Sequence, residues 1–191
     1  MNYYDKNAAE YIDKTINCDM QAQYDLLLEF VHDGSLLDVG FGSARDMLYF
    51  KSIGFDVYGI DPTKAFCDQA QRLEFKVEQS TIEEYRTNKK FDVIWACASL
   101  LHCKDINKAF LNCYDLLNSK GVLYISLKLG SGEETIDGRY FHYFTQEELN
   151  TIVKACGFII LKETITEDVF SDRNVSWLNA VLLKANPMCY N

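Results

Sequence analysis

The segment LLDVGFGSARD, residues 36–46, decides the fold class of this 191-residue chain. The apolar stretch 35–39 is typical of a buried strand, and the residues from Ser43 onward are typical of a helix. Glycines at positions 40 and 42 let the backbone approach a ligand closely, because neither carries a Cβ atom. The amino end of the following helix offers unpaired N–H groups. The segment therefore predicts a strand, a ligand-binding glycine loop and a helix.

The glycine loop is compatible with two kinds of nucleotide site. A dinucleotide site needs the spacing G-x-G-x-x-G, but Arg45 stands where the third glycine belongs. The other pattern has an acidic residue two positions before the first glycine, and Asp38, Gly40, Gly42 and Ala44 fit it. A carboxylate there repels a pyrophosphate and suits an ammonium group. The charge pattern favours S-adenosylmethionine over NAD, and a plain strand-to-helix turn is the alternative without a ligand.

A second acidic residue ends the next predicted strand. Asp61 is followed by Pro62 and comes 19 residues after Gly42 (61 − 42). A carboxylate in this position can accept hydrogen bonds from both hydroxyl groups of a ribose. An Asp before Pro is also a common turn residue. The loop and the acid together predict a nucleoside site.

The rest of the chain alternates between predicted strands and helices. After a helical segment at 1–33, we expect strands at 35–39, 56–60, 75–77, 91–96, 122–128, 158–164 and 177–185, and helices at 43–53, 63–73, 106–117 and 145–156. Residues 118–121 should form a turn and residues 130–139 a polar loop. Thr63 and Thr145 are expected to cap the helices that follow them, Thr145 in a capping box with Glu148. The alternation predicts an α/β fold with a mostly parallel, doubly wound sheet.

Composition and charge limit the possible partners. The 28 acidic and 19 basic residues give a formal net charge of −9, which disfavours nucleic acids and anionic membrane surfaces. The first residues lack the apolar stretch of a signal peptide, and no apolar run is long enough to span a membrane, so we expect a cytoplasmic protein. The seven cysteines include no C-x-x-C pair, which predicts free thiols and no metal site. The oligomeric state, monomer or homodimer, stays open.

Four segments, in this order along the chain, resemble the class I S-adenosylmethionine-dependent methyltransferases. They are LLDVGFGSARD at 36–46, FDVYGIDPT at 55–63, FDVIWACASLLH at 91–102 and LLNSKGVLYISLKLG at 116–130. The resemblance extends from about residue 35 to 185, and within the class it is closest to small bacterial tellurite-resistance-related and other small-molecule methyltransferases. It implies a Rossmann-like seven-stranded sheet of order 3-2-1-4-5-7-6, with strand 7 antiparallel. Residues 1–34 would form an N-terminal helical lid and residues 35–191 the cofactor-binding domain.

The resemblance also implies where the cofactor would lie. Asp38, Gly40 and Gly42 would line its methionine part, and Asp61 would hold its ribose. The adenine would lie near Ile60, Pro62, Thr81 and Ile82, and the backbone of Ala96 and Cys97 would face the cofactor. Many members carry an Asp before the residue that matches Ile82. This chain has Ser80-Thr81 instead, so a hydroxyl or a backbone N–H must contact the adenine amino group.

Arg45 is unusual in the first turn of a helix, where positive charge is disfavoured. Its position suggests either a ligand or an acidic partner such as Asp46, and we assign it to the cofactor site.

Methyl transfer mainly requires that acceptor, methyl group and sulfur be aligned and water excluded. A general base is needed only if the acceptor carries a proton. His102, after the fourth strand, is a candidate base or orienting group, with a turn-capping histidine as the alternative. Arg139 could pair with an anionic acceptor, Tyr140 or His142 could shape the pocket, and Lys128 ends the fifth strand. The alternative is that the 139–144 segment simply packs in the core.

Aromatic residues near the two ends of the chain complete the set of candidates. By analogy with related enzymes, Tyr4 or Tyr11 of the N-terminal segment would touch substrate or sulfonium, since a ring face favours a cation. Ordinary aromatic packing is the alternative. Trp177 and Asn179 would share one face of the last strand and either support the pocket or pack.

The sequence as a whole predicts a methyltransferase that moves a methyl group from S-adenosylmethionine to a small molecule by in-line displacement, with S-adenosylhomocysteine as product. Three alternatives stay open: an RNA or tRNA methyltransferase, a nonenzymatic S-adenosylmethionine-binding module, and an NAD-dependent oxidoreductase.

Overall fold

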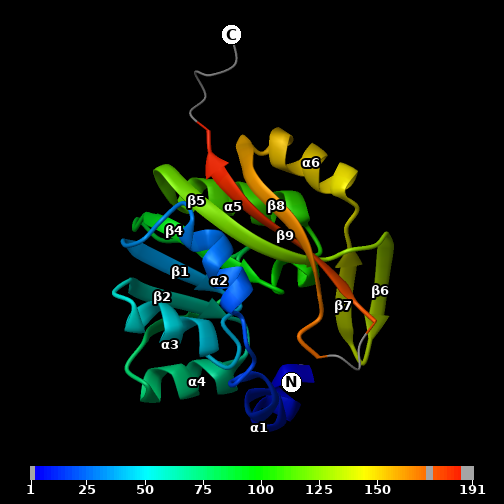
Figure 1. Ribbon diagram of the computed structural model, residues 1–191. Helices are drawn as coiled ribbons and strands as arrows, with labels where there is room; N and C mark the ends of the chain where they lie inside the picture. Colours follow the sequence, from blue (N-terminus) through cyan, green and yellow to red (C-terminus); the bar gives the residue numbers. More distant parts are fainter. Residues whose placement is uncertain (1–2, 171–173, 186–191) are drawn as a thin grey trace.

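A seven-stranded sheet lies at the centre of the computed structural model, which describes residues 3–170 and 174–185 (Figure 1). The sheet contains β1 (Ser35–Val39), β2 (Asp56–Asp61), β3 (Lys76–Gln79), β4 (Phe91–Cys97), β5 (Leu117–Lys128), β8 (Phe158–Glu167) and β9 (Ser176–Lys184). Their order is β3-β2-β1-β4-β5-β9-β8. The first five strands are parallel, and β9 runs antiparallel to both of its neighbours. The predicted order is confirmed, because β8 and β9 are the sixth and seventh strands of this sheet.

Helices cover both faces of the sheet. The helical elements are α1 (Tyr3–Thr15), α2 (Gln21–Leu28), α3 (Arg45–Ser52), α4 (Lys64–Arg72), the 3-10 turn η1 (Leu100–His102), α5 (Ile106–Leu116) and α6 (Gln146–Ala155). Side chains of α2, α3 and α4 join one core cluster, and those of α5 and α6 join the other. This is the doubly wound arrangement that the alternating pattern predicted.

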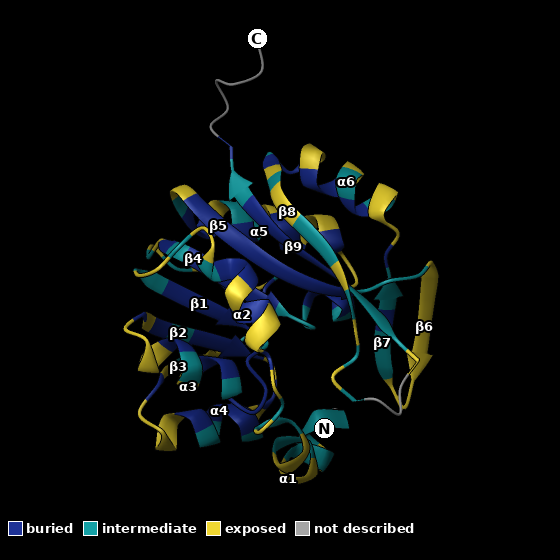
Figure 2. Ribbon diagram, in the orientation of Figure 1, coloured by how far each residue is buried: buried dark blue, intermediate teal, exposed yellow. Residues whose placement is uncertain are grey.

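The inner strands are buried on both sides, as Figure 2 shows. Leu36 and Trp95 pack under α2–α4, whereas Leu37 and Ile94 pack under α5 and α6. Near-continuous apolar strands are typical of parallel sheets covered by helices. The Trp95 ring stacks on Tyr124 with centroids 3.9 Å apart, which ties β4 to β5 below the carboxyl end of the sheet.

Two segments differ from the prediction. Residues 130–139, expected as a polar loop, begin a hairpin of β6 (Gly132–Ile136) and β7 (Arg139–Tyr143). Its turn is Asp137-Gly138, with φ angles of 52° and 76°, and Asp-Gly is a favoured hairpin turn. Residues 118–121, expected as a turn, lie within β5, where the register shifts opposite Phe91/Val93. The expected reversal is instead a bulge inside a continuous strand.

The two N-terminal helices have different roles. Helix α1 has no buried residue; it packs against α4 and the edge of the core, and it lines the pocket described below. Helix α2 buries Tyr24 and Leu27 in the core under the sheet. Helix α1 thus borders the pocket, whereas α2 belongs to the core, and the lid over residues 1–34 stays a prediction. The ends of the two predicted ranges, 1–2 and 186–191, lie outside the described residues.

The two helix caps also differ from one another. Thr145 accepts a hydrogen bond from the Glu148 amide at 3.1 Å, as predicted. The Glu148 carboxylate pairs with His142. Thr63 occupies the N-cap position of α4, but its side chain makes no capping hydrogen bond.

No helix in the described part of the chain is long and apolar enough to cross a membrane. The six cysteines that the structure describes are all free thiols. Within residues 3–170 and 174–185, no group of three or more His, Cys, Asp or Glu side chains is placed to hold a metal ion.

Candidate active site

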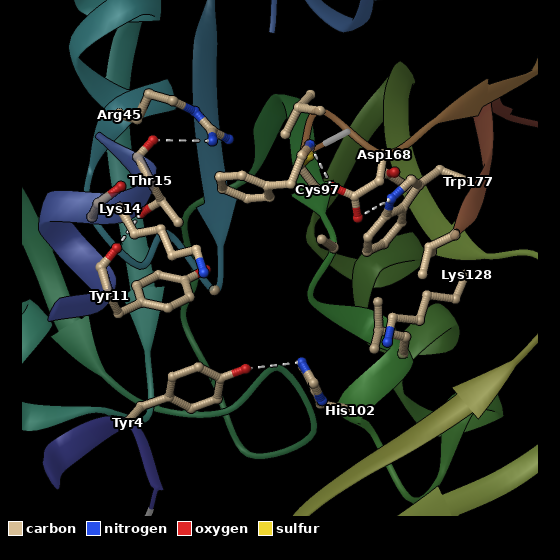
Figure 3. Close-up of a pocket in the computed structure, with 18 of the residues that line it drawn as sticks. Tyr4, Tyr11, Lys14, Thr15, Arg45, Cys97, His102, Lys128, Asp168 and Trp177 are labelled. Carbon is tan, nitrogen blue, oxygen red and sulfur yellow. Dashed lines mark hydrogen bonds between the residues drawn. The ribbon is translucent and has the colours of Figure 1, made fainter. Parts of the chain in front are cut away.

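A pocket of about 460 Å³ lies at the carboxyl ends of β1, β4 and β5 (Figure 3). Its walls come from α1 and α2, the loop after β1 with the start of α3, the end of β4 with η1, the end of β5, the β6–β7 hairpin, and the described part of the β8–β9 connection with the start of β9. This volume is within the range of small-molecule sites, and the position is where doubly wound sheets bind ligands.

The glycine loop bends sharply across the floor of the pocket. Gly40 and Gly42 have φ angles of 74° and 51°, in the left-handed region that favours glycine. The Gly40 amide donates a hydrogen bond to the Ile60 carbonyl at 2.7 Å. A Cβ atom at Gly40 would lie 2.6 Å from the Ser99 Cβ. The loop therefore requires glycine at position 40, and β1, β2 and η1 are held close together there.

Asp38, two residues before Gly40, has one carboxyl oxygen without a hydrogen-bond partner among the described residues. Its side chain is buried, and the unpaired oxygen is Oδ2. Burial raises the pKa of Asp38 well above its usual range; the Asp46 charge raises it further and Arg45 opposes the shift. A buried carboxyl oxygen without a partner fits an incoming cation, which would satisfy it.

Arg45 is held beside the pocket by the neighbouring Asp46. The Asp46 carboxylate accepts from Arg45 Nε at 2.7 Å and Nη2 at 2.9 Å. It also accepts from the Tyr24 hydroxyl at 2.6 Å and from Trp95 Nε1 at 2.9 Å. The acidic partner suggested for Arg45 is thus present, and Arg45 also lines the pocket. No motif in the sequence indicated that α2 and β4 would complete this network.

The carboxylate of Asp61 is fixed by two backbone amides and is buried. Its Oδ2 accepts from the Gly42 amide at 3.1 Å and its Oδ1 from the Thr63 amide at 2.8 Å. Burial raises the pKa of Asp61, and these two hydrogen bonds oppose the shift. Tyr11 of α1 lies over the loop, with Cε1 3.0 Å from the Cβ position at Gly42. Asp61 is 4% exposed and does not line the pocket.

The residues expected around adenine are not gathered in the pocket. Ile60 and Ile82 are buried in the core, Pro62 is exposed and Thr81 is half-buried. None of the four lines the pocket. At the end of β4, Cys97 lines the pocket whereas Ala96 is fully buried.

His102 has a defined tautomer. Its Nδ1 lies 2.7 Å from the Tyr140 carbonyl oxygen, which can only accept, so the proton is on Nδ1. Nε2 then accepts from the Tyr4 hydroxyl at 3.3 Å (Figure 3). Burial lowers the pKa of His102, and the charges of Arg139 and Lys128 lower it further, against the hydrogen bond to Tyr140. The ring is therefore neutral near pH 7 and presents a basic nitrogen toward Tyr4.

Two cations flank His102 at the hairpin side of the pocket. The guanidinium of Arg139 lies 4.0 Å from the centre of the Tyr3 ring. The ammonium of Lys128 lies 4.1 Å from the centre of the Phe141 ring. All four side chains line the pocket, so this end combines positive charge with aromatic surface.

Three predicted residues point elsewhere. The side chain of Tyr140 does not line the pocket, and only its carbonyl contacts His102. His142 pairs with Glu148 at 2.8 Å and lies outside the pocket. Asn179 is buried and accepts from the Tyr124 hydroxyl at 2.9 Å. Strand alternation turns Tyr140 and His142 away from the interior, since their neighbours Arg139 and Phe141 line the pocket. Asn179 shares a strand face with Trp177 but is buried in the fold.

The β8–β9 connection adds residues that the sequence analysis missed. Asp168 Oδ2 accepts from Trp177 Nε1 at 3.1 Å, and both residues line the pocket (Figure 3). Trp177 was a candidate, but no motif pointed to Asp168 or Phe170. Their place depends on the return of β9 beside β5, which is a long-range contact.

Part of the chain is similar in sequence to known methyltransferases. Residues 37–125 match the family model described as a methyltransferase domain. The ubiquinone biosynthesis O-methyltransferase of Rickettsia bellii (strain OSU 85-389) is 28% identical over 102 residues, which cover 50% of this chain and 42% of that protein. The corresponding protein of Rickettsia typhi is 30% identical over 97 residues, with 48% and 39% covered. The match thus spans about two fifths of the length of these curated relatives.

Solved structures share the fold over most of the chain. The 1,6-didemethyltoxoflavin-N1-methyltransferase of Burkholderia thailandensis, crystallised with 1,6-didemethyltoxoflavin and S-adenosylhomocysteine, has a TM-score of 0.79 at 19% identity, covering 95% of this chain and 86% of that one. An S-adenosylmethionine-dependent methyltransferase of Clostridium acetobutylicum has a TM-score of 0.72 at 16% identity, covering 97% and 100%. Residues 37–125 thus match a methyltransferase domain, and the chain shares the fold of these solved methyltransferases.

Proposed function

We propose that this chain binds S-adenosylmethionine in the pocket and transfers its methyl group to a small-molecule acceptor, releasing S-adenosylhomocysteine. The observation that carries the proposal is the unsatisfied Oδ2 of Asp38 beside the glycine loop. A buried, unpaired carboxyl oxygen at a loop that admits only glycine needs a cationic partner, and the amino group of the cofactor is one.

The residues at the cofactor end fit the remaining parts of this group. Asp38 would hold the amino group, and Arg45, which Asp46 keeps beside the pocket, would hold the carboxylate. Asp61, fixed by the Gly42 and Thr63 amides, would accept from the ribose hydroxyls. The covering position of α1 over Gly42 implies that α1 moves when the ribose binds.

The cofactor supplies a methyl group on a positively charged sulfur. The lone pair of the acceptor forms the new bond to the methyl carbon, and the electron pair of the carbon–sulfur bond stays on sulfur. This chain positions the acceptor and excludes water, with Tyr4 and Tyr11 of α1 covering the site. Where the acceptor carries a proton, His102 Nε2 takes it, because the tautomer fixed by Tyr140 leaves that nitrogen basic.

Several finer assignments remain predictions. A small acceptor is consistent with the comparison proteins, whose names include a toxoflavin precursor and a ubiquinone biosynthesis enzyme. We also predict a relationship to tellurite-resistance-related enzymes, a cytoplasmic location, no metal site, and a monomer or homodimer.

The cofactor assignment is tested by calorimetric titration with S-adenosylhomocysteine, with NAD in parallel. Wild-type protein should bind the former and not the latter. Asp38→Asn should bind it about 10- to 100-fold more weakly, because a charge-assisted hydrogen bond is lost. Asp68→Asn, on the exposed side of α4, is the matched control and should bind as wild type. Equal binding by Asp38→Asn would place the amino group elsewhere, and no binding by wild type would overturn the cofactor assignment.

Two alternatives give different results with the same protein. A nonenzymatic module would bind S-adenosylhomocysteine but consume no S-adenosylmethionine with any acceptor in a mass-spectrometric screen. An RNA methyltransferase would shift RNA in a salt-sensitive gel assay, which the net charge of −9 disfavours.

A further inference from the structure

We propose that the acceptor is a planar, negatively charged small molecule, an aromatic carboxylate being the simplest kind, whose anionic group binds between Arg139 and Lys128. This inference rests on the proposed function, since it concerns the acceptor end of the same pocket. It assigns a substrate class and gives the two cations a role in specificity.

The side chain of Arg139 is oriented and has a free donor with which to bind an anion. Its Nε is buried and has no hydrogen-bond partner among the described residues. Its Nη2 reaches Asp137 at 3.6 Å, but that carboxylate is largely exposed, so solvent weakens the attraction. The guanidinium lies 4.0 Å from the Tyr3 ring centre and 5.3 Å from that of Phe141. Stacking orients the guanidinium plane without neutralising it, and its edge can then donate to a carboxylate.

Lys128 supplies a second charge in the same part of the pocket. Its ammonium lies 4.1 Å from the Phe141 ring centre and 5.4 Å from that of Tyr143. Phe141 therefore lies close to both cations. Figure 3 shows Lys128 and His102 on the same side of the pocket. Both cations lower the pKa of His102, an electrostatic sign that the three groups share one space.

Two acidic residues of the β8–β9 connection that line the pocket are already engaged. Asp168 accepts from the Phe170 amide at 2.8 Å and from Trp177 Nε1 at 3.1 Å. Glu167 accepts from the Ser176 hydroxyl at 3.3 Å. These carboxylates hold the β8–β9 connection in place. This end of the pocket thus has a cationic donor without a partner, Arg139 Nε, whereas the carboxylates of Asp168 and Glu167 already accept hydrogen bonds. It therefore favours an anionic ligand over a cationic one.

The rest of the wall favours a flat ring. Tyr4, Phe141 and Trp177 line this end together with the aliphatic side chains of Leu101 and Ile136. Aromatic walls take up planar ligands by stacking, at little conformational cost. A ring held there by an anionic substituent would place its other substituents toward His102, whose Nε2 is the proton acceptor.

The test is calorimetric titration of three probes with one ring: 3-hydroxybenzoate, 3-hydroxybenzamide and 3-hydroxybenzylamine. Each is titrated into protein saturated with S-adenosylhomocysteine. The acid should bind about tenfold or more tightly than the amide, since only the acid forms charge-assisted hydrogen bonds, and the amine should bind most weakly. Arg139→Gln and Lys128→Met should each weaken binding of the acid about tenfold and leave binding of the amide unchanged.

Two further variants control for charge and folding. Lys154→Met removes one positive charge from an exposed position on α6 and should bind the acid as wild type. Arg139→Lys keeps the charge and loses the planar fork, so it should bind the acid with intermediate affinity. Thermal unfolding of each variant shows whether a loss of binding reflects a loss of fold.

Equal binding of acid and amide, preference for the amine, or no binding of the acid at millimolar concentration would overturn the inference. The binding of S-adenosylhomocysteine is measured first and separately. If it binds and the acid shows no preference, the acceptor class is wrong and the methyltransferase proposal stands. If it does not bind, the methyltransferase proposal fails, and the acid is then titrated into the free protein.

Discussion

The carboxylate of Asp46 should be among the most stabilising polar groups of the fold. It accepts four hydrogen bonds, from Tyr24, from Trp95 and twice from Arg45, at 2.6–2.9 Å. Asp46→Ala leaves the hydroxyl, the indole N–H and the guanidinium without this acceptor. The Arg45 side chain is only 18% exposed, so its charge is poorly solvated. Removing one partner of a buried ion pair costs about 3–5 kcal/mol.

We therefore expect Asp46→Ala to lower the free energy of unfolding by about 4 kcal/mol. The individual losses are not summed, because groups in one network do not contribute additively. For a chain of this length, the melting temperature should fall by roughly 8–16 °C. Urea unfolding followed by far-UV circular dichroism gives the free energy, and Trp fluorescence reports on the indole that donates to Asp46.

A double variant separates the charge from the hydrogen bonds. Arg45→Met with Asp46→Ala leaves no buried cation, so it should be more stable than Asp46→Ala alone although it lacks more native contacts. Asp68→Asn changes an exposed carboxylate and should stay within about 0.5 kcal/mol of wild type. A loss below about 1 kcal/mol for Asp46→Ala, the scale of a surface ion pair, would refute the reasoning.

Three further perturbations have expected outcomes. Gly40→Ala should lose about 2 kcal/mol or more in urea unfolding, because of its positive φ and the contact with Ser99; unchanged stability would contradict the close packing. His102→Gln should become more stable relative to wild type as the pH falls, since His102 in the unfolded chain binds its proton at its ordinary pKa of 6.5 and in the native state only at lower pH; parallel stability curves would contradict the lowered pKa. Lys128→Met should raise the pKa of His102 in an NMR titration, because a nearby positive charge is removed; an unchanged pKa would mean that Lys128 does not face the ring.

The local motifs could be predicted because each is defined by residue types within a short stretch of sequence. The turn around Gly40 and Gly42 and the acid Asp61 at the end of the second strand follow from spacing alone, and the structure brings them together through the Gly42–Asp61 hydrogen bond. Strand order followed from a family resemblance, since periodicity does not say which strands are neighbours. The hairpin at Asp137-Gly138 had a turn signal in the sequence, but the polar composition of its first strand concealed it.

Contacts between distant segments could not be predicted. Asp46 meets Tyr24 across 22 residues and Trp95 across 49, and no repeat or spacing connects these positions. The tautomer of His102 depends on the Tyr140 carbonyl, 38 residues away. The side chain of Tyr140 was the expected participant, yet the strand turns it outward and leaves its backbone to make the contact.

Because β9 is antiparallel, the two ends of the pocket are built from different parts of the sequence. Because β9 returns between β5 and β8, the described part of the β8–β9 connection reaches the carboxyl edge of the sheet and lines the pocket, at the end we assign to the acceptor. The methyltransferase family match ends at residue 125, one residue before the first acceptor-end residue on β5, Ser126. In the proposed enzyme, the matched segment would carry the cofactor residues, and the acceptor walls on β5, the hairpin and the described part of the β8–β9 connection come after it. On this proposal, exchanging the last third of the chain would change most of the acceptor walls, apart from Tyr4, Leu101 and His102, and leave the cofactor residues unchanged.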